Sequence, residues 1–249
     1  MKQLWCAILV ALVMAAPART SAQTADEVIE KHLAAIGGRA TLGKLTSRTM
    51  TGTIALATPA GELTGSIEGY TLAPNKTRQV IKVDLSQFGA GNLVIDQRFD
   101  GTTGYILDSM NGNREVTGNQ LENMKNTVFP SPLLAYKDAG TKVEMVGKDK
   151  IGEKDVLVIQ LTPKSGSASK QFIDAETFLL LKTVATVNVP QLGGDVEQIV
   201  EFSDYRDVNG VKVPFTLKAS NPAQSYTVTV KTVEHNKPID EKSFVKPAP

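Results

Sequence analysis

The chain has 249 residues, of which 41% are hydrophobic and 21% are charged, and its formal net charge is +1. This composition is typical of a globular protein, and so small a net charge favours neither a nucleic acid nor an anionic membrane as a partner. The length is enough for one sizeable domain and does not require two.

The N-terminal segment has the pattern of a secretory signal peptide. A basic start with Lys2 precedes an apolar run from Leu4 to Ala16, and small residues that include Thr20 and Ala22 follow it. We therefore predict a signal peptide over residues 1–22, with cleavage before Gln23. The alternative, a membrane anchor, is disfavoured because the run is shorter than the ~20 apolar residues that span a bilayer. We expect no stable membrane insertion after cleavage.

The single cysteine, Cys6, lies inside the segment that we expect to be removed. It precedes most of the apolar run, which argues against a lipid-modified cysteine at the cleavage site. The mature domain, residues 23–249, would contain no disulfide bond, so its fold must depend on an ordinary hydrophobic core.

One early helix is indicated after the cleavage site. Thr24 and Glu27 have the spacing of a capping box, and apolar residues then recur on one face until Gly37 and Gly38. The pattern predicts a helix that starts after Thr24 and ends before these glycines, with a short helical turn from Ala40 to Leu45 behind it.

From Arg48 onward the apolar residues recur with a period of two, which is typical of β strands. Turn-forming pairs such as Asp100-Gly101 and Asn209-Gly210 separate the segments. In many of them one face is apolar and the other polar, as from Val211 to Leu217. A long antiparallel meander with one apolar face must curl around its own cover.

The strand pattern lapses between Gly118 and Gly140. Apolar residues there suggest a short helix, a break at Pro130 and Pro132, and a further helical turn through Tyr136. We predict a helical insert over about residues 119–139 that covers the apolar face of the sheet. It would act as a lid over a cavity or, equally well, as a plug of the core.

No catalytic or metal-binding motif is present. His32 and His235 lie in different elements without metal-ligand spacing, and we interpret His32 as a partly exposed structural residue and His235 as a strand-end residue. We expect no catalytic residue, no metal site and no cofactor, and we do not expect the protein to be an enzyme.

Several short segments occur in the order in which they occur in LolA-like proteins. They are Ala73-Pro74-Asn75, Phe99-Asp100-Gly101 with Tyr105, Asp174-Ala175-Glu176-Thr177, the run from Val208 to Pro214, and the closing segment from Pro238 to Phe244. The chain therefore resembles the LolA-like family, which carries outer-membrane lipoproteins or lipids through the bacterial periplasm. The resemblance covers essentially the whole mature chain.

This resemblance implies a mainly β fold with covering helices, a half-open antiparallel β barrel of about 11 strands in one domain. It also implies a periplasmic location and a binding or carrier function for a lipid acyl chain or a lipoprotein. In the lipoprotein carriers an arginine typically precedes the Pro-Asn step, where this chain has Ala73. The alternative function is therefore an envelope sensor or protein-interaction module on the same scaffold, with an envelope protein as its partner.

Residue parity along the strands suggests which side chains would line the apolar cavity, although ordinary core packing would explain each of them as well. The candidates are Ile54, Ile67, Ile81, Leu93, Tyr105, Leu107, Ile159 and Phe202 from the sheet, and Met124, Phe129, Leu133 and Leu134 from the lid.

Overall fold

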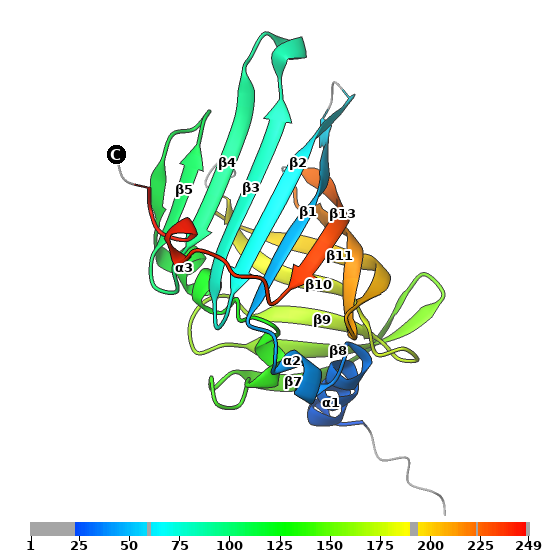
Figure 1. Cartoon of the computed structure of the whole chain (residues 1–249). Coiled ribbons are helices and arrows are strands. Elements are labelled where there is room, and N and C mark those ends of the chain that lie inside the picture. Colours follow the sequence, from blue (N-terminus) through cyan, green and yellow to red (C-terminus); the bar gives the residue numbers. More distant parts are fainter. Residues whose placement is uncertain (1–22, 59–60, 190–193, 223, 248–249) are drawn as a thin grey trace, which may run out of the picture.

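The structure is a computed structural model of the chain, and it describes residues 23–58, 61–189, 194–222 and 224–247 (Figure 1). The predicted signal peptide and Cys6 lie outside the described residues. The helices and single 3₁₀ turns are α1 (Ala25–Ala35), α2 (Arg39–Leu42), η1 (Ser86–Phe88), α3 (Gly118–Lys125), η2 (Pro132–Leu134) and η4 (Glu241–Ser243).

Helix α1 begins and ends where the sequence predicts. Thr24 and Glu27 form the expected capping box, and Ile36 is the C-cap residue. Gly37 follows with a φ of +134°, and a Cβ atom there would lie 2.6 Å from the carbonyl oxygen of Gly210. Only glycine allows this close approach, which brings the end of α1 against the start of β12.

All thirteen described strands form one antiparallel sheet, in the order β6-β5-β4-β3-β2-β1-β13-β12-β11-β10-β9-β8-β7. The expected fold class is confirmed, with 13 strands instead of about 11. Three-residue β6 is too short to show a period of two. The strands are β1 (Ser47–Thr58), β2 (Gly61–Leu72), β3 (Lys76–Asp84), β4 (Asn92–Phe99), β5 (Gly104–Asp108), β6 (Arg114–Val116), β7 (Lys142–Ile151), β8 (Lys154–Thr162), β9 (Ser169–Asp174), β10 (Leu180–Val189), β11 (Gly194–Val208), β12 (Val211–Ser220) and β13 (Ser225–His235).

The first and last strands pair with each other. Ile54 of β1 lies opposite Val228 of β13, so the two ends of the meander meet in the middle of the sheet. The sheet instead remains open between its edge strands, β6 and β7, which are consecutive in the chain. Residues 117–141, with α3 and η2, connect these two edges, and this is the position predicted for the helical insert.

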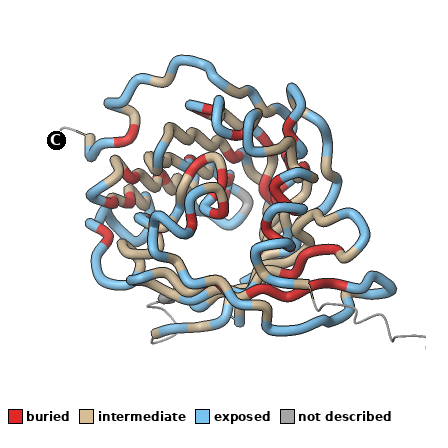
Figure 2. Tube along the Cα trace, turned by 90° about the horizontal axis from the view of Figure 1, so that it is seen from below, coloured by how far each residue is buried: buried red, intermediate tan, exposed pale blue. Residues whose placement is uncertain are grey.

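One face of the curled sheet carries the main core. Helix α1 contributes Val28, Ile29 and Leu33, the insert contributes Phe129 and Leu133, and the strands contribute residues of a single parity. Figure 2 shows the buried segments mainly toward the inside of the molecule and the exposed segments mainly along its outside. We call the face that meets the helices the inner face.

The C-terminal segment lies against the opposite, outer face. Figure 1 shows it crossing the lower ends of β1 to β4 after β13 ends. The side chain of Phe244 is 1% exposed, and Arg98 donates a hydrogen bond of 3.1 Å to the backbone oxygen of Val245. Beneath it, Asp96 pairs with Arg78 at 2.8 Å and with Arg98 at 2.7 Å.

Candidate functional site

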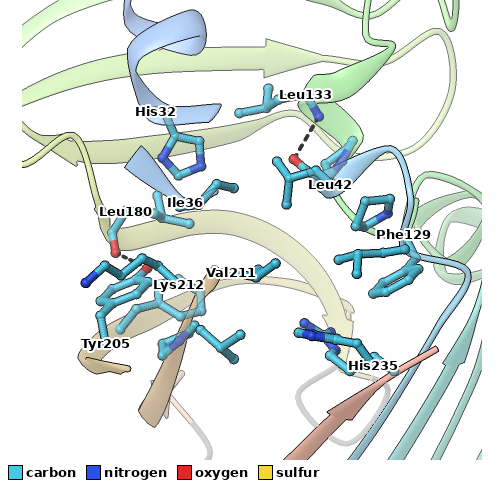
Figure 3. Close-up of a pocket in the computed structure, with 18 of the residues that line it drawn as sticks. His32, Ile36, Leu42, Phe129, Leu133, Leu180, Tyr205, Val211, Lys212 and His235 are labelled. Carbon is cyan, nitrogen blue, oxygen red and sulfur yellow. Dashed lines mark hydrogen bonds between the residues drawn. The ribbon is translucent and has the colours of Figure 1, made fainter. Parts of the chain in front are cut away.

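A cavity of about 190 Å³ lies between the inner face, helices α1 and α2, and the insert (Figure 3). We call it the apolar cavity because most of its walls are aliphatic or aromatic. The residues that line it are His32, Ile36, Leu42, Leu45, Arg48, Phe129, Pro130, Ser131, Pro132, Leu133, Gln171, Leu180, Phe202, Tyr205, Val211, Lys212, Val213, Pro214 and His235.

A second cavity, of about 240 Å³, is bordered by residues of β1 to β4 and of helix α3. We call it the polar cavity because hydroxyl, amide and guanidinium groups form much of its wall. The residues that line it are Arg48, Met50, Gly69, Tyr70, Thr71, Thr77, Arg78, Gln79, Gln97, Met124 and Thr127. Arg48 borders both cavities, so the two spaces meet at its side chain.

The insert that covers the apolar cavity is fixed to the rest of the fold at three points. Arg39 of α2 donates a hydrogen bond of 2.8 Å to the backbone oxygen of Leu134. The backbone N–H of Phe129 donates to the oxygen of Pro74 at 2.8 Å, and Tyr136 donates to the carboxylate of Asp26. The insert therefore covers the cavity with a defined geometry.

Arg48 is a cation without an acidic partner in the part of the chain that the structure describes. No ion pair or side-chain hydrogen bond of its guanidinium is found there. The guanidinium makes a cation–π contact with Phe129, with 5.4 Å between the guanidinium carbon and the ring centroid. Burial lowers the pKa of Arg48. Desolvation without a compensating anion is unfavourable for any ionised group.

His235 lies directly opposite Arg48 across the β1–β13 pair. Its Nδ1 atom is buried and has no hydrogen-bond partner. Burial lowers the pKa of His235, the charge of Arg48 lowers it further, and the backbone of Val208 acts in the other direction. The imidazole is therefore neutral near pH 7 and presents an unused nitrogen beside the guanidinium.

The charges around the apolar cavity have one sign. Arg48 lies in its wall and Lys212 at its mouth, and none of the described residues that line the cavity is an aspartate or a glutamate. His32 is 5% exposed and donates from Nδ1 to the backbone oxygen of Phe178 at 2.8 Å, so the expectation that it is partly exposed is wrong. Helix α1 turns this residue toward the core with Leu33.

The predicted cavity residues divide into three groups. Phe129, Leu133 and Phe202 line the apolar cavity, and Met124 lines the polar cavity. Other candidates belong to the main core beside these cavities without lining either one: Ile54, Ile67, Ile81, Leu93, Leu134 and Ile159. Ligand binding by any of them stays a prediction.

Tyr105 and Leu107 lie on the outer face, so their assignment to the inner face is wrong. Their neighbour Ile106 is buried with Phe99 and Met124, and alternate residues of a strand point to opposite faces. The ring of Tyr105 is covered by the ammonium group of Lys246 from the C-terminal segment, 4.8 Å from its centroid. Apolar residues on β5 therefore pack on both faces of the sheet.

Parity analysis missed the polar residues of the apolar cavity, among them Arg48, Gln171 and His235. Arg48 shares the parity of Met50 and Ile54, so the signal was present two residues before the apolar run. Gln171 lies between Ile159 and Thr183 in the sheet, and its Oε1 atom is buried without a hydrogen-bond partner.

Other kinds of site are not found in the described part of the chain. No three His, Cys, Asp or Glu side chains there are grouped as a metal site would require. Within the same residues, no helix is long and apolar enough to cross a bilayer.

Comparison with solved structures gives many extensive matches, among them the following three. A LolA superfamily protein from Nitrosomonas europaea has a TM-score of 0.58 and 13% identity, over 90% of this chain and 99% of that chain. A DUF1329 family protein from Desulfovibrio piger has a TM-score of 0.57 and 11% identity, over 89% and 97%. A domain named as an outer-membrane lipoprotein-sorting protein, from Vibrio parahaemolyticus, has a TM-score of 0.56 and 11% identity, over 88% and 95%.

The chain has a LolA-like fold. No family model matches the sequence, and no curated protein is similar to it in sequence. At identities this low the structural likeness concerns the fold alone.

Proposed function

We propose that this LolA-like protein is an exported periplasmic carrier that binds the acyl chain of a lipid or lipoprotein in the apolar cavity. The observation that carries the proposal is a hydrophobic space between the inner face and the insert, lined by Leu42, Leu133 and Phe202 among others. Aliphatic chains bind such spaces because each buried methylene contributes about 0.8 kcal/mol.

The size of the space limits the ligand. Each cavity is smaller than the ~300–1,000 Å³ usual for sites of drug-sized ligands. A chain with eight buried methylene groups would gain about 6 kcal/mol, which corresponds to a dissociation constant of tens of micromolar. The proposal therefore favours a single chain of moderate length whose polar end reaches Arg48, where the cavities meet.

Native mass spectrometry of the mature protein from its own periplasm tests this function. A lipid adduct that dissociates on activation is expected, and titration of the stripped protein with 1-decanol should show saturable binding. The Phe202→Arg variant places a charge in the apolar cavity and should abolish decanol binding. Phe88→Arg is the matched control, because Phe88 is 53% exposed and lines neither cavity. Ligand-free spectra together with absent decanol binding would refute the carrier function.

A second candidate, a protein-interaction module, is favoured by two exposed apolar side chains. Phe88 follows β3 and Met110 follows β5, with exposures of 53% and 61%. β4 pairs antiparallel with both β3 and β5, so these two strands run in the same direction and their C-terminal ends lie on the same side of the sheet. Crosslinking in cells from a probe at position 88 should give one stable protein adduct if these strand ends bind a partner. If no adduct forms, only the carrier function remains.

A further inference from the structure

The walls of the apolar cavity contain a polar group that an alkyl chain alone does not explain. Arg48 of β1 borders both the apolar and the polar cavity, with the ring of Phe129 5.4 Å from its guanidinium carbon and His235 opposite it on β13. Buried ionised groups in proteins are normally paired. Arg48 is half-buried and has no such partner among the described residues, so an anion is the group that its surroundings lack.

The position and chemistry of the neighbouring groups fit an oxyanion. A guanidinium presents a planar fork of N–H donors that matches a carboxylate or a phosphate. His235, directly across from Arg48, holds an unpartnered Nδ1 on the same inner side. An anion seated at Arg48 would remove the charge that now disfavours protonation of His235, so His235 could become a second charged donor.

Electrostatics favours the same kind of ligand. The cavity wall and mouth carry the cations Arg48 and Lys212 but no acidic side chain among the described lining residues. Cavities with charges of one sign and apolar walls concentrate ligands of the opposite charge. The polar cavity on the far side of Arg48 then provides hydroxyl and amide groups for the remainder of a head group.

We propose that the ligand is an anionic amphiphile whose carboxylate or phosphate monoester head binds to Arg48 and His235 while its aliphatic tail occupies the apolar cavity. This inference rests on the proposed binding function and specifies its ligand class. The two head groups share an oxyanion on an alkyl chain, and separate titrations distinguish them.

The test compares ligands of equal chain length by isothermal titration of the stripped mature protein. Decanoate or decyl phosphate should bind about 30-fold more tightly than 1-decanol, as expected for a desolvated, charge-assisted hydrogen-bonded pair. Acetate and inorganic phosphate, which lack the tail, should show no saturable binding. The anion with the larger advantage over decanol identifies the head group.

Substitution of the guanidinium locates the anion. Arg48→Met should reduce the decanoate affinity to that of decanol and leave the decanol affinity within about 3-fold of the parent value. Arg48→Gln serves as a second variant, so that a folding defect in one does not decide the result. Lys218→Met is the matched control: it removes a positive charge from an exposed side chain of β12 that lines neither cavity, and it should change decanoate binding by less than about 3-fold.

The outcomes separate this inference from the proposed function. Equal affinities for decanol and decanoate would overturn the anionic head group and leave the acyl-chain carrier intact. An equal loss in Lys218→Met and Arg48→Met would overturn the binding of the head group at Arg48, because only the summed charge of the protein would then matter. If no ligand of the series binds, the carrier function fails as well.

Discussion

The guanidinium carbon of Arg48 lies 5.4 Å from the centroid of the Phe129 ring, and this contact joins the first strand to the insert. A cation over an aromatic face is worth about 0.5–2 kcal/mol, which is less than the penalty of removing an arginine from water without an anion. The empty protein therefore keeps a half-buried cation whose charge a bound anion would neutralise.

Replacement of this group should stabilise the empty protein. We expect Arg48→Met to raise the free energy of unfolding by about 1 kcal/mol, because methionine fills similar space without an unpaired charge. Arg78→Met is the control and should lower it, because it leaves Asp96 with one partner fewer. Urea denaturation measures both changes, and a loss of stability in Arg48→Met would contradict the account of its burial.

The two histidines should make the protein less stable in weak acid. Burial lowers the pKa of His32, although the hydrogen bond to the Phe178 carbonyl acts in the opposite direction. Burial also lowers the pKa of His235, and the positive charge of Arg48 lowers it further. The unfolded chain binds these protons first, so stability is complete above pH ~6.5 and falls as the pH drops below that value toward the folded-state pKa values. We expect a loss of about 1 kcal/mol between pH 7.5 and 5.5 in urea titrations.

His32→Asn tests the origin of this loss, because an asparagine amide can donate to the same carbonyl and does not titrate. The variant should retain about half of the pH dependence. An unchanged slope would show that His32 takes no part in it.

Helix α3 is attached to the β8–β9 loop through a close approach at Gly166. Its φ is +86°, and a Cβ atom there would lie 2.7 Å from side-chain atoms of both Asn123 and Asn126. Gly166→Ala should destabilise the fold by about 2 kcal/mol and speed amide exchange in α3. Gly152→Ala, at φ +60° with open space around it, carries only the backbone penalty and should lose about 1 kcal/mol. Equal losses would mean that the contact with α3 is unimportant.

The C-terminal segment should contribute to stability through one side chain. Phe244→Ala removes a side chain that is 1% exposed and is expected to lower the free energy of unfolding by about 3–4 kcal/mol. Val245→Ala, next to it and 42% exposed, should change it by less than about 0.5 kcal/mol. Similar effects of the two would show that the segment is not docked through Phe244.

Local patterns in the sequence were sufficient for much of the architecture. The capping box at Thr24 and the glycine pair after Ile36 fix α1, because both act within a few residues. The lapse of alternation after Gly118 marks the insert for the same reason. The pairing of β1 with β13 depends on contacts between distant parts of the chain, and no local pattern predicts it.

Most of the polar part of the candidate site was not predictable, and β13 shows why. Tyr226, Val228 and Val230 alternate toward the inner face, and continued alternation would turn His235 outward. A register shift opposite Thr51 and Gly52 inserts one extra residue in β13, which brings Val233 and His235 to the inner side. Bulges of this kind change parity without a reliable signature in a single sequence.

The pairing of β1 with β13 has a consequence for the synthesis of the protein. Ribosomes deliver residues 47–58 long before residues 225–235, so the hydrogen-bonding edge of β1 must wait for its neighbour until almost the entire polypeptide has emerged. An unpaired edge recruits other chains. Nascent copies are therefore most prone to associate with one another just before the last strand arrives.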